Sequence, residues 1–186
     1  MDFSEIKKQN LSKKDRSDIG GWDVEVLELC KKINSKEEYY TTSSCSGRIV
    51  LLKYSDKKQS GLFLFRTHNK VTFNKLKKEL GNIEDKGLVY FKQEPALVVV
   101  ACNSLENAKK LLRIAKEVGF MRSGIMSSGK RIVVEIMSTE GIALPLMDNG
   151  KIFISDEHLR LVVREANRKL EKTREKLRKL EKLLEF

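Results

Sequence analysis

The C-terminal segment, residues 156–186, carries the pattern that most restricts how this chain can fold. Apolar residues recur there at alternating spacings of four and three, which is a heptad seam interrupted only by Thr173. Ser155 can cap such a helix, and Asp156 and Glu157 complement its dipole. We therefore predict one basic helix of about 29 residues, which would be about 43 Å long. The seam consists of Leu159, Val163, Ala166, Leu170, Leu177, Leu180 and Leu184.

A helix with such a seam has two uses, and the sequence leaves both open. The seam can dock along a sheet of the same chain, with the basic outer half projecting toward nucleic acid. Alternatively, it can pair with a second copy in a coiled coil. We expect docking for the first half of the helix and leave the second half open, so a homodimer through this helix is one expected assembly.

The rest of the chain combines short strand patterns with amphipathic helices. Helices are predicted over residues 23–33, 71–80 and 105–118, with Asp23 and Ser104 as N-caps and Gly119 as a C-cap. Strands are predicted over residues 48–54, 62–67, 88–92, 97–102, 125–127, 132–137, 142–146 and 152–154. We predict an α+β fold, a single domain with duplicated strand–strand–helix units and a long C-terminal helix. Residues 1–155 would form its core and residues 156–186 the helix.

Positive charge is concentrated in one part of the chain. The net charge is +11, and residues 41–100 hold 11 basic but only 5 acidic side chains. A basic field of this kind favours a polyanion such as nucleic acid, although lysines on a solvated surface are the simpler explanation. The candidate RNA-binding residues are Lys53, Lys57, Lys58, Arg66, Lys70, Lys75, Lys77 and Lys78.

Small hydrogen-bonding side chains gather just before a predicted buried strand. The segment runs from Thr41 to Arg48 with the sequence TTSSCSGR, and an apolar run begins at Ile49. Such side chains at the end of a strand can form a polar pocket on rigid support, and Gly47 allows close approach of a ligand to the backbone. Arg48 adds a planar cation suited to carboxylate or phosphate. A Ser/Thr-rich turn without chemistry is the alternative.

Several familiar kinds of site find no support in the sequence. There is no G-x-G-x-x-G fingerprint, no phosphate-binding loop and no G-x-S-x-G elbow. Cys30, Cys45 and Cys102 match no metal signature, and only His68 and His158 could add imidazole ligands, so we expect no metal. A cysteine nucleophile at Cys45 paired with His68 remains open. Because no apolar run approaches the ~20 residues that span a bilayer, we expect no membrane insertion and a cytoplasmic protein.

The hydroxyl-rich segment belongs to a longer pattern. Ser43-Ser44-Cys45-x-Gly47-Arg48 resembles the S-x-S-S-C-x-G-R motif of the tRNA wybutosine-synthesizing protein 3 family, with Thr41 in place of the first serine. Phe63 and Val99 stand where some members carry Trp and His. Further matches occur in order along nearly the whole chain: Asp15-x-Ser17-x-x-Gly20-x-x-Asp23, Asn34, Thr67-His68, Glu94-Pro95, Gly119-Phe120-x-x-Ser123-Gly124-Ile125, Gly141-x-x-x-Pro145-Leu146 and Ala166-Asn167.

The resemblance implies methyl transfer from S-adenosylmethionine to a ring nitrogen, N4, of the tricyclic wyosine-type base beside the anticodon of tRNA(Phe). An anticodon loop exposes its bases, so a protein can hold one without opening a duplex. The implied partner is therefore the anticodon stem-loop of this tRNA. The implied donor-binding residues are Thr41, Ser43, Ser44, Cys45, Gly47, Arg48, Ser123 and Gly124.

His68 is the candidate proton acceptor, because imidazole titrates near neutrality. Asp23 or Asp15 could orient His68 or serve in its place. Both His68 and Asp23 also have structural explanations, as the end of a strand and as a helix cap. A second hypothesis for the whole chain is a non-catalytic RNA-binding module that only grips phosphate, and a third is a scaffold organised by the heptads.

Overall fold

The computed structural model describes residues 2–13, 23–57, 60–84, 86–129 and 131–184. Two of the predicted site residues, Asp15 and Lys58, lie outside these described residues. The described chain divides into two units. Unit 1 takes its residues from 1–46, 96–139 and 173–186, and unit 2 from 47–95 and 140–172. Because the long helix α5 (Asp156–Leu183) crosses residue 172, its first part belongs to unit 2 and its last part to unit 1.

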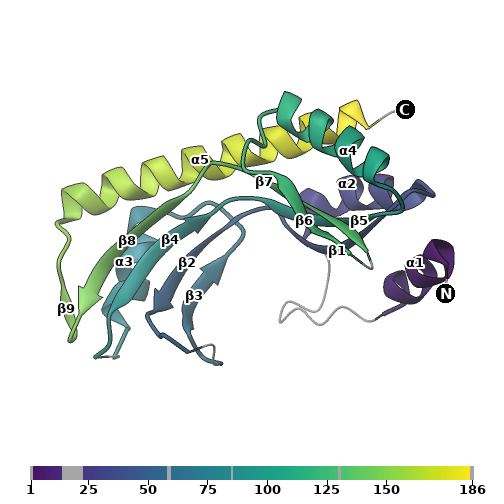
Figure 1. Ribbon diagram of the computed structural model, residues 1–186. Helices are drawn as coiled ribbons and strands as arrows, with labels where there is room; N and C mark the ends of the chain where they lie inside the picture. The colour runs from purple at the N-terminus through teal and green to yellow at the C-terminus, as the bar shows by residue number, and fades with distance from the viewer. Residues whose placement is uncertain (1, 14–22, 58–59, 85, 130, 185–186) are drawn as a thin grey trace. The chain divides into compact units, whose positions relative to one another are not determined.

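Unit 1 is an antiparallel four-stranded sheet with helices on one face (Figure 1). The strand order is β1-β5-β7-β6, where β1 is Tyr39–Cys45, β5 is Leu97–Cys102, β7 is Ile132–Met137 and β6 is Gly124–Ser128. Apolar side chains of the sheet pack with α2 (Val24–Ser35), α4 (Leu105–Glu117) and the end of α5. Helix α1 (Phe3–Leu11) instead contacts β1 through Phe3, whose ring lies 5.3 Å from that of Tyr40.

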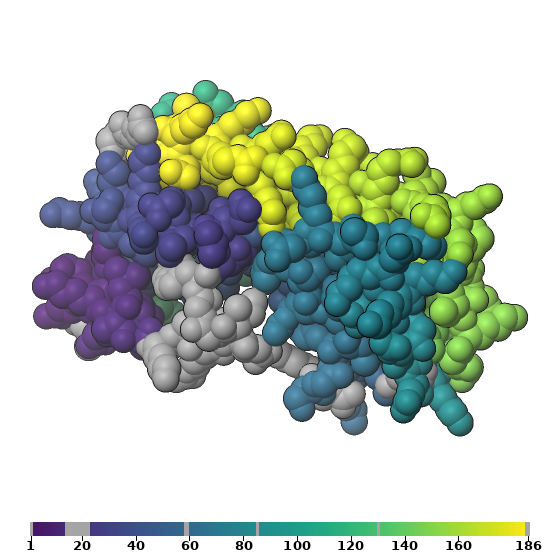
Figure 2. Space-filling view, turned by 180° about the vertical axis from the view of Figure 1, so that it is seen from behind, coloured from purple at the N-terminus to yellow at the C-terminus, as the bar shows by residue number. Residues whose placement is uncertain are grey.

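Unit 2 is an antiparallel five-stranded sheet. The order is β3-β2-β4-β8-β9, where β3 is Phe63–Thr67, β2 is Arg48–Lys53, β4 is Val89–Glu94, β8 is Ile142–Asp148 and β9 is Lys151–Ile152. Helix α3 (Phe73–Gly81) and the first part of α5 bury one face of this sheet (Figure 1). Figure 2 shows the unit from behind, with residues of α3 and α5 at the surface. The core includes Ile49 and Leu51 from β2, Phe91 from β4 and Leu76 from α3.

The predicted α+β class and long C-terminal helix are confirmed. Strand, strand and helix also follow each other twice along the chain, as β2-β3-α3 and β4-β5-α4. Strands β2 and β3 pair with each other, but β4 and β5 belong to different sheets. The chain leaves unit 2 between Pro95 and Ala96, so the second repeat is one of order and not of pairing. Strand β1 and helix α1 were not predicted.

The heptad seam of α5 is buried within its own chain. Leu159, Val163, Ala166 and Leu170 lie in the core of unit 2, whereas Leu177, Leu180 and Leu184 lie in the core of unit 1. Thr173, the break in the seam, is fully buried in unit 1, where its hydroxyl accepts a hydrogen bond of 3.1 Å from the Ala96 N–H. The second half of the helix therefore docks like the first, and the expected homodimer through this seam lacks a surface. Among the described helices, none has the length and apolarity needed to cross a membrane.

We predict that Leu177→Ala lowers the free energy of unfolding by about 2–4 kcal/mol, because it removes a buried side chain from a packed core. Leu183→Ala is the matched control, since Leu183 is 43% exposed whereas Leu177 is 1% exposed. Urea unfolding followed by circular dichroism measures both, and native mass measurement gives the assembly. A wild-type dimer that becomes a monomer in Leu177→Ala would instead assign the seam to a partner chain.

Candidate active site

Most of the hydroxyl-rich segment lies within an edge strand. Thr41 to Cys45 form the greater part of β1, which pairs only with β5 among the described strands. The β1–β5 register shifts between Thr41 and Ser43, which leaves Thr42 as an extra, exposed residue. Such a bulge re-aims the side chains that follow it. The segment was predicted to form a polar pocket just before a strand, but most of it is itself a strand.

The side chains of this strand divide between the two faces of the sheet. Directly paired residues share a face. Thr41 and Ser44 pair with Val100 and Val98, which belong to the core that packs against the helices. Ser43 and Cys45 pair with Val99 and Leu97, which point to the opposite face. Ser43 is exposed and Cys45 is partly buried on that face. The predicted donor-binding hydroxyls therefore do not all line one surface.

Helix α2 holds the inward-facing hydroxyls. The side-chain oxygen of Asn34 accepts the Thr41 N–H at 2.7 Å, and its amide nitrogen donates to the Thr41 hydroxyl at 2.9 Å. One turn earlier on the helix, burial raises the pKa of Cys30 to about 11, although hydrogen bonds with Ser44 and Thr41 oppose the shift. Thr41 and Ser44 thus hold β1 against α2 on the helix-covered face. The Ser43 side chain points to the opposite, exposed face.

Ser123 and Gly124 lie at the other edge of the same sheet. The strand pairings connect Gly124 to Ser43 across the sheet. Gly124 pairs with Glu135 of β7, and Glu135 pairs with Val99 of β5. Val99 in turn pairs with Ser43. Three inter-strand spacings separate Gly124 from Ser43, or about 14 Å. Ser123 is buried, and its hydroxyl accepts the Met137 N–H at 3.1 Å. These two predicted donor-binding residues are therefore not brought together with the segment on β1.

Asp23 fixes the end of the hydroxyl-rich segment. One carboxylate oxygen caps α2 by accepting the Glu25 N–H at 3.3 Å, and the other accepts the Ser46 N–H at 2.7 Å. A carboxylate oxygen also lies within 4.8 Å of the Cys45 sulfur. The predicted helix cap is confirmed, and the same side chain ties the start of α2 to the residue that follows β1.

His68, which follows β3, binds the backbone of the same short segment. Its Nδ1 lies 3.0 Å from the carbonyl oxygen of Gly47. A carbonyl can only accept, so in the neutral ring Nδ1 carries the proton and Nε2 is the basic nitrogen. Gly47 has a φ of 95°, in the left-handed region that favours glycine. The ring of His68 is thereby held in one tautomer at a backbone turn that needs Gly47.

Arg48 is held by two partners within unit 2. Its Nε lies 2.5 Å from a carboxylate oxygen of Glu94, the residue directly opposite on β4. Its guanidinium carbon also lies 4.8 Å from the centre of the Phe63 ring. Both contacts restrict the guanidinium to the face of the sheet that carries Phe63, so a ligand carboxylate would meet Arg48 only there.

The predicted RNA-binding cations do not form one surface. Lys70 and Lys75 form ion pairs of 2.9 and 2.8 Å with Glu171 and Glu79, and Lys77 pairs with Asp156. These lysines and Lys78 lie in or beside α3, on the helix-covered side of the sheet. Lys53 pairs with the buried Val89 and shares that side, whereas Arg66 lies opposite Val50, on the other face. Lys57 is exposed in the loop after β2.

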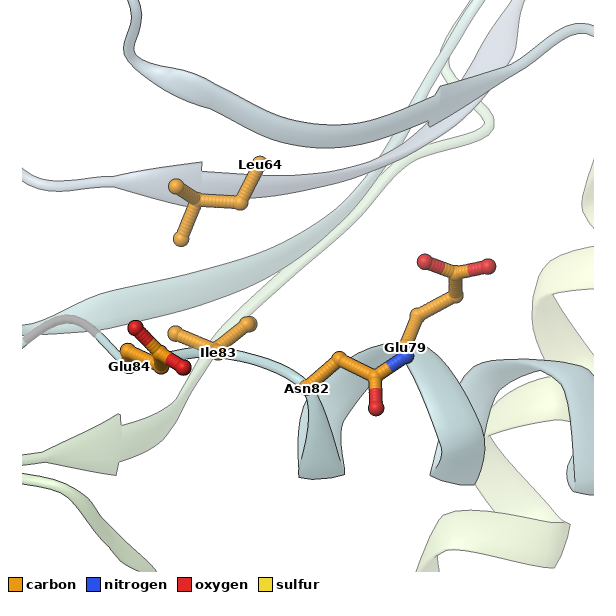
Figure 3. A pocket seen from close by; sticks show the side chains of 5 residues that line it. All are labelled: Leu64, Glu79, Asn82, Ile83 and Glu84. Atoms are coloured by element: carbon orange, nitrogen blue, oxygen red, sulfur yellow. The ribbon is translucent and has the colours of Figure 1, made fainter.

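A shallow hollow of about 440 Å³ lies in unit 2, away from these residues. Figure 3 shows its lining: Leu64 of β3 lies across from Ile83 and Glu84, and Glu79 and Asn82 at the end of α3 lie beside them. Its two carboxylates would repel phosphate, and none of the predicted site residues lines it.

Comparison with known proteins identifies the class of protein that carries these features. A family model described as Methyltransferase TYW3 matches residues 3–186, so the chain belongs to this methyltransferase family. The resemblance predicted from the segment on β1 is thereby confirmed.

The chain is also similar to individual relatives over most of their length. The chain is 38% identical over 178 residues to a protein of Thermococcus sibiricus named tRNA(Phe) 7-((3-amino-3-carboxypropyl)-4-demethylwyosine(37)-N(4))-methyltransferase, covering 94% of this chain and 90% of that one. It is 35% identical over 181 residues to the tRNA wybutosine-synthesizing protein 3 homolog of Xenopus laevis, covering 94% of this chain and 71% of that protein. The solved structure of the PH1069 protein from Pyrococcus horikoshii superposes with a TM-score of 0.89 at 34% identity, covering 98% and 96% of the two chains.

We predict that the three thiols differ sharply in reactivity. Burial raises the pKa of Cys30 to about 11 and that of Cys102 to about 12, so both remain protonated and inaccessible at pH 8. Iodoacetamide should therefore modify the partly exposed Cys45 first, as read by peptide mass mapping. In urea all three should react together, and the Cys45→Ser variant should lose the fast phase. Labelling of native Cys30 at the rate of Cys45 would contradict this account of α2 and β1.

Proposed function

We propose that this protein transfers a methyl group from S-adenosylmethionine to N4 of the wyosine-type base beside the anticodon of tRNA(Phe). The observation that carries the proposal is membership of the TYW3 methyltransferase family over residues 3–186. The Thermococcus relative, whose name states this reaction, is similar along nearly its whole length. The similarity to this relative covers both units of the chain. Similarity over the whole length supports a shared reaction, whereas a shared RNA-binding segment alone would match only part of the chain.

The residues on β1 suit a site for the methyl donor. Ser43 offers an exposed hydroxyl for an amino or ribose group, and Cys45 supplies a small wall on the same face. Thr41 and Ser44 support the strand from behind, as their bonds to α2 indicate. We leave Ser123 and Gly124 out of this site, because they lie three strands away. S-adenosylmethionine supplies an activated one-carbon unit when bound, and the protein supplies alignment of donor and acceptor.

His68 is the residue that we assign to the proton. A base nitrogen that gains a methyl group in place of its hydrogen must release that proton. Nδ1 of His68 donates to the Gly47 carbonyl, which leaves Nε2 as the acceptor. Asp23 anchors Ser46, the neighbour of Gly47, so we assign it a positioning role. Asp15, outside the described residues, remains a candidate base from the sequence alone.

The decisive experiment is methyl transfer itself. The protein is incubated with S-adenosylmethionine labelled in the methyl group and with hypomodified tRNA(Phe), and the label is located by nucleoside analysis. Label on N4 of the tricyclic base supports the proposal. RNA binding without label transfer would favour the second hypothesis, a non-catalytic RNA-binding module.

We predict that Ser43→Ala weakens donor binding about tenfold, the loss of one to two hydrogen bonds at about 1 kcal/mol each, and leaves unfolding unchanged. Ser43 is exposed, so the fold does not depend on its hydroxyl. Ser44→Ala is the matched neighbour, and it should lower stability while changing donor affinity little, because Ser44 faces Cys30. Calorimetric titration and urea unfolding measure the two effects. The reverse pattern would place the donor on the helix side of β1.

We predict that His68→Ala lowers turnover 10²–10⁴-fold, the usual contribution of a positioned base, with a much smaller change in donor affinity. His68→Gln is the control, because its amide can still donate to the Gly47 carbonyl but cannot accept a proton at neutral pH. Loss of turnover in both variants assigns the proton to His68. Full activity in His68→Gln would show that the side chain only braces the Gly47 turn.

A further inference from the structure

We propose that the open face of the five-stranded sheet of unit 2 binds a single-stranded RNA segment by stacking its bases on Tyr54 and Tyr90. The inference rests on the proposed function for the identity of the RNA, an anticodon loop. Tyr54 and Tyr90 would hold that loop, and neither was among the RNA-binding residues predicted from the distribution of charge.

The register of β2, β3 and β4 defines this face. Ile49, Leu51, Val89 and Phe91 point toward α3 and α5. The alternate residues point the other way, and their pairings are direct: Val50 with Lys92 and Arg66, and Leu52 with Tyr90 and Phe63. We call this second surface the open face. Its surface residues are Arg48, Leu52, Tyr54, Phe63, Arg66, Tyr90, Lys92 and Glu94, whereas Val50, on the same side of β2, is fully buried.

Two tyrosines form the aromatic part of the open face. Tyr54 continues β2 by donating its N–H to the Leu88 carbonyl at 2.7 Å, which keeps it on the side of Leu52. Its ring centre lies 6.2 Å from that of Tyr90, with the planes at 43°. Tyr54 is 52% exposed, so its ring surface is accessible. Stacking on such rings is tolerant of sequence, because every base has a π-face.

Cations surround the aromatic rings of the open face. The ammonium of Lys92 lies 5.9 Å from the centre of the Tyr90 ring. Phe63, which is 41% exposed, has Arg48 and Arg66 at 4.8 and 5.3 Å from its ring centre. These contacts hold the long side chains near the sheet while their charge remains at the surface. Rings that alternate with cations suit a strand of bases and phosphates.

The charges on the two faces of the sheet favour RNA as the ligand and favour the open face as its binding surface. On the open face of β2, β3 and β4, the cations Arg48, Arg66 and Lys92 outnumber the one carboxylate, Glu94, which is paired with Arg48. A second carboxylate, that of Asp56 in the loop after β2, accepts a hydrogen bond from the Tyr54 hydroxyl, so the three cations still outnumber the acidic groups at this surface. On the helix side, Lys70, Lys75 and Lys77 are each paired with a carboxylate, so phosphate would have to displace an ion pair. An uncharged peptide would gain nothing from the cations, whereas a polyanion gains from both rings and charges.

The test is RNA binding without methyl donor, measured by fluorescence anisotropy of a labelled tRNA(Phe) anticodon stem-loop at several salt concentrations. We expect Tyr54→Leu to weaken binding about tenfold with an unchanged salt dependence, since it removes a stacking ring and no charge. Lys92→Gln should weaken binding and lower the slope of log K against log salt by about one. Phe153→Leu is the matched control, because Phe153 is an exposed ring 5.3 Å from the Lys151 ammonium, outside the open face.

A second measurement keeps the inference independent of these variants. Photocrosslinking of a 4-thiouridine-substituted stem-loop to the wild-type protein should map to peptides that contain Tyr54 or Tyr90. Wild-type affinity in Tyr54→Leu, or crosslinks confined to α3, would overturn the inference. Because binding is measured without turnover, that result leaves the proposed methyl transfer standing. Conversely, tight binding that depends on Tyr54 but leads to no label transfer supports this face and removes the proposed reaction.

Discussion

The burial of one apolar seam on α5 is the constraint on which both units depend. Leu159 to Leu170 complete the core of unit 2, and Leu177 to Leu184 complete the core of unit 1. Thr173 lies where the seam passes from one core to the other, and its buried hydroxyl satisfies the Ala96 N–H. A regular heptad repeat is usually a sign of a partner helix. Here the same spacing serves two sheets of one chain, so the helix is part of both interiors.

Several residues of the family motif hold the backbone and do not face a ligand. Asn34 clamps Thr41 through its amide, and Asn167 of α5 does the same for Val71, whose N–H and carbonyl it binds at 2.9 and 2.8 Å. Asp23 and His68 bind the backbone of two consecutive residues, Ser46 and Gly47. These partly buried amides and the carboxylate satisfy peptide groups of β1 and of the turns that strand pairing leaves without partners. These residues of the motif thus fix the backbone around β1 and so keep the Ser43 side chain in its exposed position.

The sequence predicted the elements of this fold better than their pairing. Helical periodicity and the caps Asp23 and Ser104 located α2 and α4, because both are local signals. Strand β1 was missed because consecutive Ser and Thr also favour turns, and its alternation is visible only once Thr41 and Ser44 meet α2. The separation of β4 from β5 and the division of the hydroxyls between two faces depend on register, which is a long-range property.

The interleaving of the two units along the chain has a consequence for biosynthesis. Unit 1 begins before residue 46 but takes Leu177 and Leu180 into its interior, and unit 2 needs residues 159–170. Neither hydrophobic core can close while the ribosome still holds α5 in its exit tunnel. The nascent sheets therefore keep an uncovered apolar side until α5 has left the ribosome, and during that interval their exposed apolar surface makes them prone to aggregation.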